Sequence, residues 1–378
     1  MKTSFLTNCL GILGVGLATL VSTANAKENN RRENNAGILY TMDNASAGNH
    51  VLVITRTGGA LSVTASYATG GLGLGTAPGL GSQGSVILSP DSQWLFVCNA
   101  GSGEISVFET LPGGELQLTD KVGSGGGQPV SLTLQGSLLY VLNVAANGSS
   151  DNVTAFHFGC GNLTLLPGST RSLSAASTTP TQVTFSRGGD ALIVTEKVTG
   201  LIDTWLLGHD GMATNHQVFT SVGIWPFGFA VGRGDQLFVS EAAAGAPNGS
   251  SVSSYELSTS GSLAVISGKV PTEQTAACWL VLTYDGHYVY TANAGSASLS
   301  GFQVNWDGSL KLLANPSLPA KTGMHPADMA FSQDGQVLFS LNNGDGSISA
   351  FGVESDGGLQ PQSGLSGLPT TSAGLAGW

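Results

Sequence analysis

The chain has 378 residues, of which 55 are glycine and only 10% are charged, and its formal net charge is −11. With 13 basic residues in all and no basic cluster beyond Arg31-Arg32, this composition argues against nucleic acid as a partner. Glycine at this frequency, without a collagen period, is typical of a protein with many tight turns. No apolar 3.6-residue period runs past two turns after the N-terminus, which argues against a helical protein.

The first 26 residues have the features of a secretory signal. Lys2 gives a positive start, residues 9–21 form an uncharged apolar run, and Ala24-Asn25-Ala26 is a small-x-small cleavage pattern. The apolar run is shorter than the roughly 20 residues of a membrane span. We therefore expect a secreted or periplasmic protein with no membrane anchor after cleavage. Residues 27–36 are expected to be a disordered leader, and residues 37–378 a single domain.

One sequence pattern recurs along that domain. In its clearest form, a short apolar strand leads through Ser-x-Asp-Gly into a second strand that ends in Asn, followed by a Gly-rich loop and Ser-x-Phe, and the other copies are looser. The copies centre on Leu39, Leu95, Leu139, Leu192, Leu237, Val289 and Leu338. A period of about fifty residues, with four strands in each unit, indicates a β-propeller.

The two ends of the chain complete each other in this pattern. The first unit, which begins at Ile38, lacks its first strand, and residues 374–378 resemble a first strand with no unit after it. We therefore predict an all-β, seven-bladed propeller of four-stranded antiparallel blades, with the first blade closed by the C-terminal strand.

The strand order places the start of the first strand and the end of the second strand on one face, which we call the top face. The Asp-Gly turns lie on the bottom face. Two sets of residues are then expected to surround the top opening as substrate-binding groups: the strand-ending amides Asn99, Asn143, Asn293 and Asn342, and the aromatic walls Trp225 and Trp279.

Two glutamates replace the strand-ending amide in consecutive units, at Glu196 and Glu241. If their carboxylates meet across a blade boundary, one pKa rises and an acid/base pair results. Alternatively, Glu196 pairs with Lys197 or with a loop backbone. Strand alternation is expected to turn Lys197 away from Glu196 and out of the channel.

Other chemical groups are sparse. His325 is the one histidine expected beside the top opening, whereas Arg187 and Arg233 fall in bottom turns. No His/Cys/Asp cluster has metal-ligand spacing, and there is no nucleophile or phosphate-loop motif, so no cofactor is expected.

The repeats Ser332-Gln333-Asp334-Gly335, Asn293-Ala294-Gly295-Ser296 and Asp356-Gly357-Gly358-Leu359, with the closing Gly374-Leu375-Ala376, resemble those of the lactonase propellers. That family includes bacterial 6-phosphogluconolactonases and fungal 3-carboxymuconate lactonizing enzymes. The resemblance extends from Ile38 to Trp378 and implies the seven-bladed fold.

The functional positions depart from the family pattern. In the fourth blade, the phosphogluconolactonases have a Pro-His-x-His segment, and this chain has Thr178-Thr179-Pro180-Thr181 in its place. In the last blade, the family has His-Pro-Arg, and this chain has His325-Pro326-Ala327. The resemblance keeps an acidic residue at Glu196, but the arginine suited to a phosphate is missing.

Two functions remain open at this stage. In the first, a hydrolase opens a neutral lactone or ester, with Glu196 or Glu241 as the base, His325 as the acid and Asn99 or Asn293 as a neutral oxyanion donor. In the second, a propeller without chemistry binds a glycan or a protein through its top loops. In either case we expect a monomer with a small-molecule lactone or a glycan as its partner.

Overall fold

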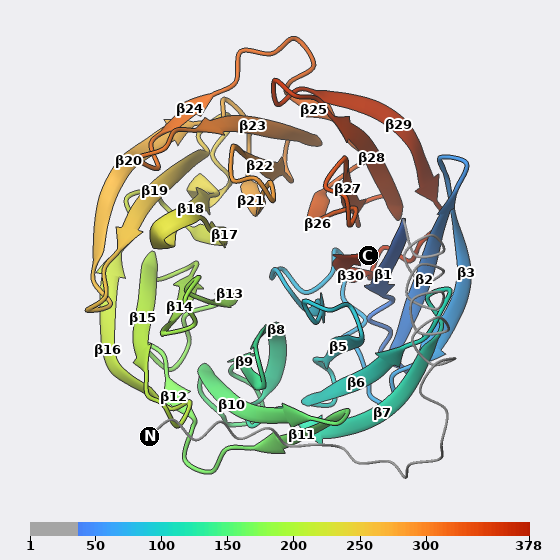
Figure 1. Ribbon diagram of the computed structural model, residues 1–378, viewed down its shortest axis with the longest axis vertical. Coiled ribbons are helices and arrows are strands. Elements are labelled where there is room, and N and C mark those ends of the chain that lie inside the picture. Colours follow the sequence, from blue (N-terminus) through green and yellow to red (C-terminus); the bar gives the residue numbers. More distant parts are fainter. Residues whose placement is uncertain (1–36) are drawn as a thin grey trace, which may run out of the picture.

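The computed structural model describes residues 37–378, so the predictions for residues 1–36 lie outside the described part of the chain. Seven antiparallel sheets surround one axis (Figure 1). The predicted all-β, seven-bladed propeller is confirmed. The only helical elements in residues 37–378 are the 3-10 turns η1 (Arg233–Asp235) and η2 (Ala243–Gly245). None of the helices in this range has the length and apolar character needed to cross a membrane.

Each blade runs from an innermost strand beside the channel to an outermost strand at the rim. In this order, blade 1 contains β30 (Ala373–Gly377), β1 (Ile38–Met42), β2 (His50–Thr57) and β3 (Ala60–Ala68). Blade 2 contains β4 (Val86–Leu88), β5 (Trp94–Asn99), β6 (Glu104–Thr110) and β7 (Leu116–Gly123). Blade 3 contains β8 (Gln128–Gln135), β9 (Leu138–Val144), β10 (Asn152–Gly159) and an outer edge split into β11 (Asn162–Leu165) and β12 (Arg171–Ser172). Blade 4 contains β13 (Pro180–Phe185), β14 (Ala191–Glu196), β15 (Leu201–Leu207) and β16 (Ala213–Thr220).

The remaining three blades follow the same order. Blade 5 contains β17 (Pro226–Val231), β18 (Gln236–Glu241), β19 (Ser251–Leu257) and β20 (Leu263–Pro271). Blade 6 contains β21 (Ala277–Leu282), β22 (Tyr288–Asn293), β23 (Ser298–Val304) and an outer edge split into β24 (Leu310–Leu312) and β25 (Ala320–Lys321). Blade 7 contains β26 (Pro326–Phe331), β27 (Val337–Asn342), β28 (Ser347–Val353) and β29 (Leu359–Ser366).

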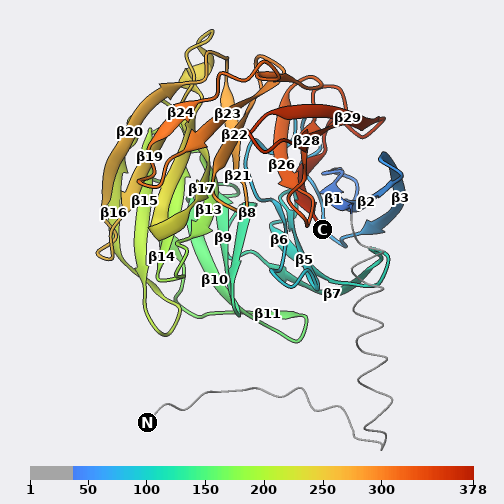
Figure 2. The ribbon, with the colours of Figure 1, turned by 45° about the horizontal axis from the view of Figure 1, so that its top comes forward.

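The C-terminal strand closes the ring, as the sequence predicts. β30 pairs antiparallel with β1, with Leu39 opposite Gly377 and Tyr40 opposite Ala376. The Trp378 N–H donates to the Ile38 carbonyl at 2.8 Å, which extends the ladder past the end of the strand. Both views place the C-terminus beside β1 (Figures 1 and 2). The first and last segments of the domain therefore share one sheet, and neither is left as an open edge.

The turn chemistry explains why the Ser-x-Asp-Gly pattern reverses the chain. In the turn between β26 and β27, the Ser332 hydroxyl donates to Asp334 at 2.6 Å and accepts the Val337 N–H at 3.0 Å. Gly335 follows at φ 71°, a left-handed conformation that favours glycine. The turn between β4 and β5 repeats the serine and aspartate bonds with Ser89 and Asp91, at 2.5 Å between their side chains.

The core lies between neighbouring sheets. Aromatic side chains cross the blade boundaries edge to face: Phe96 of blade 2 meets Phe158 of blade 3 at 4.9 Å between ring centroids. Tyr140 of blade 3 meets Phe185 of blade 4 at 5.8 Å. Such pairs contribute roughly 0.5–1.5 kcal/mol each beyond the burial of their area. Blade packing thus holds the inner strands in a fixed ring, which positions everything at the channel.

Candidate functional site

The top of the central channel is closed by a segment of the loop between β3 and β4. The Ser82 hydroxyl donates to the Val130 carbonyl of blade 3 at 2.8 Å. The Gln83 N–H donates to the Thr181 carbonyl of blade 4 at 2.9 Å. We call residues 82–84 the plug.

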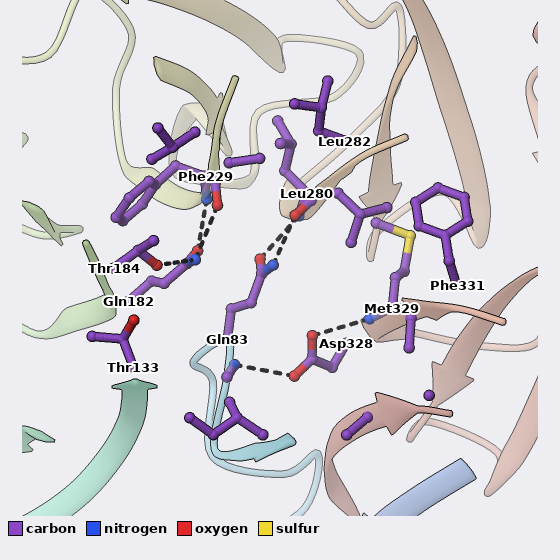
Figure 3. Close-up of a pocket in the computed structure, with 18 of the residues that line it drawn as sticks. Gln83, Thr133, Gln182, Thr184, Phe229, Leu280, Leu282, Asp328, Met329 and Phe331 are labelled. Atoms are coloured by element: carbon purple, nitrogen blue, oxygen red, sulfur yellow. Dashed lines mark hydrogen bonds between the residues drawn. The ribbon is translucent and has the colours of Figure 1, made fainter. Parts of the chain in front are cut away.

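The plug is also tied to the opposite side of the ring. The Gln83 amide donates to the Leu280 carbonyl at 2.7 Å and accepts the Leu280 N–H at 3.0 Å (Figure 3). The Gly84 N–H donates to Asp328 at 3.2 Å, and the Trp279 indole donates to the Ser82 carbonyl at 2.8 Å. Contacts with blades 3, 4, 6 and 7 therefore block the top end, where the sequence predicts an opening.

Below the plug the channel widens into a chamber of ≈860 Å³ that all seven inner strands line. Arg187 and Arg233, together with Pro90, Asp285 and Gly286, surround its lower end. These residues belong to the turns between first and second strands. The bottom position predicted for the two arginines is thus confirmed, and the chamber opens on their face.

Above the plug, blades 4 to 7 share a local backbone arrangement. The residue just before the inner strand is left-handed in each, at φ 53° to 61°, and these residues are Thr179, Trp225, Ala276 and His325. Each carbonyl accepts the N–H of the residue that follows the second strand, in the pairs Thr179 with Lys197, Trp225 with Ala242, Ala276 with Ala294, and His325 with Asn343. In blades 3 to 7, a shift of register also interrupts the inner strand near its first residues. Such irregularities aim side chains and are frequent beside active sites.

Because of this arrangement, the residues that lie next to the channel are the ones that follow the second strands, and not the ones that end them. The strand-ending side chains are fully buried at 0% exposure, namely Asn99, Asn143, Glu196, Glu241, Asn293 and Asn342. The residue after each of them follows on the opposite side of the strand. The strand-ending residues therefore do not line an opening, contrary to the sequence prediction, and their part in substrate binding stays a prediction.

The buried amides bond to the third strand of their own blade or to the loop that enters it from the preceding blade. Asn99 accepts from the Thr69 hydroxyl at 2.7 Å and donates to the Ser106 hydroxyl at 2.8 Å. Asn342 donates to Ser347 and Ser349 at 3.0 and 2.9 Å. Asn293 makes the equivalent pair of bonds with Ser298 and Ser300, and Asn143 donates to the Ser124 carbonyl at 3.2 Å.

Glu196 is held by the loop backbone, which was one of the open alternatives. Its carboxylate accepts the Ser174 N–H at 2.9 Å, the Ser174 hydroxyl at 2.5 Å and the Thr199 hydroxyl at 2.6 Å. Burial raises its pKa, but hydrogen bonds from Asp203, Ser174 and Thr199 outweigh it, so the pKa lies below its usual value. Glu196 is thus an anion within the blade.

The carboxyl group beside Glu196 is that of Asp203, not that of Glu241. Burial, followed by the proximity of Glu196, raises the pKa of Asp203 to about 7 despite a hydrogen bond with His216. His216 Nε2 lies 2.6 Å from Asp203 Oδ1, and its ring stacks on Trp205 at 4.3 Å. A protonated Asp203 can donate to the Glu196 carboxylate, so below the raised pKa of Asp203 the two buried acids share one proton.

Glu241 occupies a separate, equally closed position. It accepts the Gly223 N–H at 2.8 Å and the hydroxyls of Ser221, at 3.4 Å, and of Ser251. None of these partners contacts Glu196. The two glutamates are each saturated by their own loop, so the proposed acid/base pair of Glu196 and Glu241 finds no support in these contacts, and their catalytic roles stay predictions.

Lys197 takes a position that the sequence did not predict. Its ammonium group lies 5.7 Å from the Trp225 ring centroid and 5.6 Å from that of Phe227, so it extends over the aromatic wall of the channel top. Burial lowers the pKa of Lys197, and the Cys278 thiol is its one electrostatic neighbour. Within residues 37–378 no carboxylate pairs with this ammonium.

The aromatic wall connects Lys197 to His325. The rings of Phe227 and Trp279 lie 4.8 Å apart, and that of Trp279 lies 6.1 Å from the His325 ring. His325 Nδ1 is 2.9 Å from Asn343 Oδ1. With Nδ1 donating to the amide oxygen, Nε2 carries the free lone pair. Lys197, Trp225, Phe227, Trp279 and His325 form the candidate site, which we call the top cluster.

Neither the top cluster nor any other part of residues 37–378 groups three or more His, Cys, Asp or Glu residues in a way that could hold a metal ion. Burial raises the pKa of Cys278 to about 12, so its thiol stays protonated at neutral pH and is a poor nucleophile. The chemistry available at this face is therefore that of one ammonium group, one imidazole and the exposed part of the Trp225 ring, because Phe227 and Trp279 are buried.

A family model described as "Lactonase, 7-bladed beta-propeller" matches residues 31–185 and 193–366. A comparison with curated proteins gives no match. Among solved structures, a candidate 6-phosphogluconolactonase from Bacteroides fragilis is similar with a TM-score of 0.67 and 18% identity, over 90% of this chain and 97% of the other.

Two further structures are similar to the same degree. The periplasmic gluconolactonase of Pseudomonas aeruginosa gives a TM-score of 0.67 and 18% identity, over 89% of this chain and 98% of the other. A candidate 6-phosphogluconolactonase from Bacteroides uniformis gives a TM-score of 0.67 and 16% identity, over 89% and 98%. At these identities the similarity concerns the fold.

Proposed function

Because this chain belongs to the family of seven-bladed lactonase propellers, we propose that it hydrolyses a lactone at the top cluster. The observation that carries the proposal is the Lys197 ammonium group. It lies over the rings of Trp225 and Phe227 with no carboxylate within the described chain to neutralise it. A fixed positive charge on an aromatic surface is suited to stabilise an oxyanion on a bound ester.

The two polar groups of the cluster divide the reaction between them. His325 Nε2 takes a proton from water as the water oxygen attacks the lactone carbonyl carbon. The Lys197 ammonium group stabilises the oxyanion that forms on the carbonyl oxygen. The carbonyl carbon to ring oxygen bond then breaks, and His325 returns its proton to the leaving alkoxide. The product is a hydroxy acid.

The charge of the site favours a lactone without a phosphate group. Lys197 is the one cation of the top cluster, and the mechanism uses it for the developing oxyanion. Arg187 and Arg233, which could hold a phosphate, line the opposite end of the channel below the plug. We therefore propose a neutral lactone, as the sequence indicates, rather than 6-phosphogluconolactone.

The protein is further proposed to act outside the cytoplasm. The signal pattern of the first 26 residues supports this, and one structural neighbour is a periplasmic enzyme. Cell fractionation with N-terminal sequencing of the mature protein should give a chain that begins at Lys27. A full-length chain recovered from the cytoplasm would contradict export.

One observation favours binding without catalysis as a second function. The two glutamates that would supply a carboxylate base are buried and saturated. The half-exposed face of Trp225 could then hold a glycan ring by stacking.

A hydrolysis assay separates the two functions. Wild-type protein is tested by pH titration of released acid against a panel of unsubstituted and sugar lactones. Lys197→Met should lower kcat/KM by roughly 10²–10³ through loss of one oxyanion donor. His325→Gln should lower it by roughly 10²–10⁴ through loss of the proton carrier.

Lys311→Met is the matched control, because Lys311 is exposed on the outer strand β24 and should leave kcat/KM unchanged. Turnover that survives in the Lys197 and His325 variants would rule out the top cluster as the catalytic site. No turnover of any lactone by the wild type, together with glycan binding that Trp225→Ala abolishes, would establish the second function.

A further inference from the structure

The chamber below the plug is separate from the top cluster. The plug closes it above, and its entrance lies among the bottom turns. Its volume of ≈860 Å³ is within the range of small-molecule pockets, roughly 300–1,000 Å³. The proposed lactone chemistry uses none of this space.

The chamber wall is mixed, with aliphatic side chains beside the polar groups of Gln83, Thr133, Gln182, Thr184 and Asp328 (Figure 3). Inner strands of four blades place partly exposed apolar side chains on it, namely Leu88, Leu134, Val231 and Leu282. Because the blades are rigid around it, the space keeps its shape without a ligand. Apolar side chains that remain in contact with solvent inside a fixed cavity favour an apolar occupant.

The buried polar side chains of the chamber, Gln182 and Asp328 among them, already have partners. Gln182 donates to Thr184 at 3.0 Å and to the Phe229 carbonyl at 2.9 Å, and it accepts the Phe229 N–H at 2.7 Å (Figure 3). Asp328 accepts the N–H groups of Gly84 and Met329. Within the described chain, no buried side-chain atom of the chamber lacks a hydrogen-bond partner. An occupant therefore need not supply polar groups inside.

The entrance has the opposite character, because two guanidinium groups line it. Arg187 is exposed, and no described residue bonds to its guanidinium group. Arg233 donates to the Asp285 carbonyl and lies over the Trp306 ring at 5.5 Å, so its position is fixed. The Asp285 carboxylate also lines the entrance, but it is engaged with Thr283 at 2.6 Å and with His287.

We propose that the chamber is a second ligand site, which takes a monocarboxylic acid with an aliphatic tail. The tail lies against the aliphatic part of the chamber wall, and the carboxylate lies at the entrance, where Arg187 and Arg233 line the cavity. Guanidinium groups recognise carboxylates through paired N–H donors, so the entrance selects the acid over an alcohol of the same length.

Calorimetric titration with octanoate and with 1-octanol, below their micellar or solubility limits, tests both parts of the proposal. We expect one octanoate per chain and at least tenfold weaker binding of the alcohol. Arg187→Glu should weaken octanoate binding by roughly tenfold or more through loss of a charged hydrogen-bond donor. Lys311→Glu, which makes the same change of charge on an outer strand, should leave binding unchanged.

Two variants fill the chamber. Thr133→Trp and Leu88→Trp each place an indole in the open space, and Thr133 makes no side-chain hydrogen bond that the change would break (Figure 3). Either should abolish octanoate binding while lactone hydrolysis at the top cluster continues. Failure of the wild type to bind octanoate, or full binding by a folded filled variant, would overturn the site. Equal binding of octanol, or no effect of Arg187→Glu, would overturn the assignment to an acid.

Discussion

The two ends of the channel are built from the same seven blades but are chemically opposite. At the top, Lys197 and His325 border an aromatic surface, and the plug seals the channel beneath them. At the bottom, a chamber with a mixed aliphatic and polar wall opens beside two arginines. In both places the repeat supplies the backbone, and individual residues that depart from it supply the chemistry.

The difference depends on one non-repeating segment. The plug lies between the top cluster and the chamber. Residues 82–84 divide the channel because Gln83 reaches across to β21 while its own N–H bonds to β13. A short insertion between two blades thus creates two distinct environments in a fold that otherwise repeats itself.

Removal of residues 373–378 is the change that should eliminate both ends together. β30 completes the first sheet, and its Leu375 and Ala376 line the chamber. Loss of this strand exposes the edge of β1 and opens the ring. We expect no cooperative thermal unfolding transition and loss of lactone hydrolysis. A truncated protein that melts at the wild-type temperature would refute closure by the C-terminal strand.

A smaller change, Gln83→Ala, tests whether the Gln83 side chain holds the plug that separates the two ends. It leaves the buried N–H and carbonyl of Leu280 without their side-chain partner, which should cost about 2–4 kcal/mol in the free energy of unfolding. Denaturant unfolding measures this loss. Gln117→Ala, an exposed glutamine on β7, is the control and should change stability by less than about 0.5 kcal/mol. Equal stabilities of the two variants would mean that the plug is not held by Gln83.

The smallest expected effect is on the pH dependence of the free energy of unfolding, and it concerns the proton that Asp203 and Glu196 share in blade 4. Because the folded-state pKa of Asp203 is raised to about 7, its contribution to stability is fully present below the unfolded value near 4 and is lost as pH rises through 7. In Asp203→Asn, the amide NH2 can donate to Glu196 and the amide oxygen can accept from His216, so neither hydrogen bond needs a protonated acid. We therefore expect the variant to gain about 1–3 kcal/mol in stability relative to wild type between pH 5 and pH 8.

Chemical unfolding between pH 5 and 8 measures this effect. A residual slope should remain in Asp203→Asn, because burial also raises the pKa of Asp328 to about 7. Asp203→Ala is the matched variant that removes the acid but supplies no donor, and it should be less stable than Asp203→Asn at every pH. Identical pH profiles of wild type and Asp203→Asn would show that Asp203 holds no extra proton.

The fold was predictable because its signals are local. Each Ser-x-Asp-Gly turn carries its own hydrogen bonds, as at Ser332 and Asp334, and the unpaired first and last units imply closure. The placement of Lys197 was not predicted because the strand-ending residue was taken to face the channel. An alignment of the repeats shows the signal: Lys197 stands where blades 5, 6 and 7 have Ala242, Ala294 and Asn343.

No sequence pattern predicts the plug. It lies in a Gly-rich loop without alternation or period, and the partners of Gln83 are distant in sequence. The hydrogen bonds of Gln83 form because the assembled ring leaves the backbone groups of Leu280 unpaired. No sequence pattern near residue 83 indicates that these distant groups need a partner. The face on which the chamber opens could therefore not be read from the repeats.

The pairing of β30 with β1 also sets an order of events during synthesis. Ile38 leaves the ribosome before blades 2 to 7, and its partner Trp378 leaves after them. Blades 2 to 7 can form as the chain emerges, because each is contiguous in sequence, whereas β1 must wait with one edge unpaired. Closure must wait until the whole domain has been synthesised. Its entropic cost is nevertheless moderate, because that cost rises only with the logarithm of the separation between the two ends. During that interval the exposed edge of β1 is the part of the nascent chain most open to pairing with another copy.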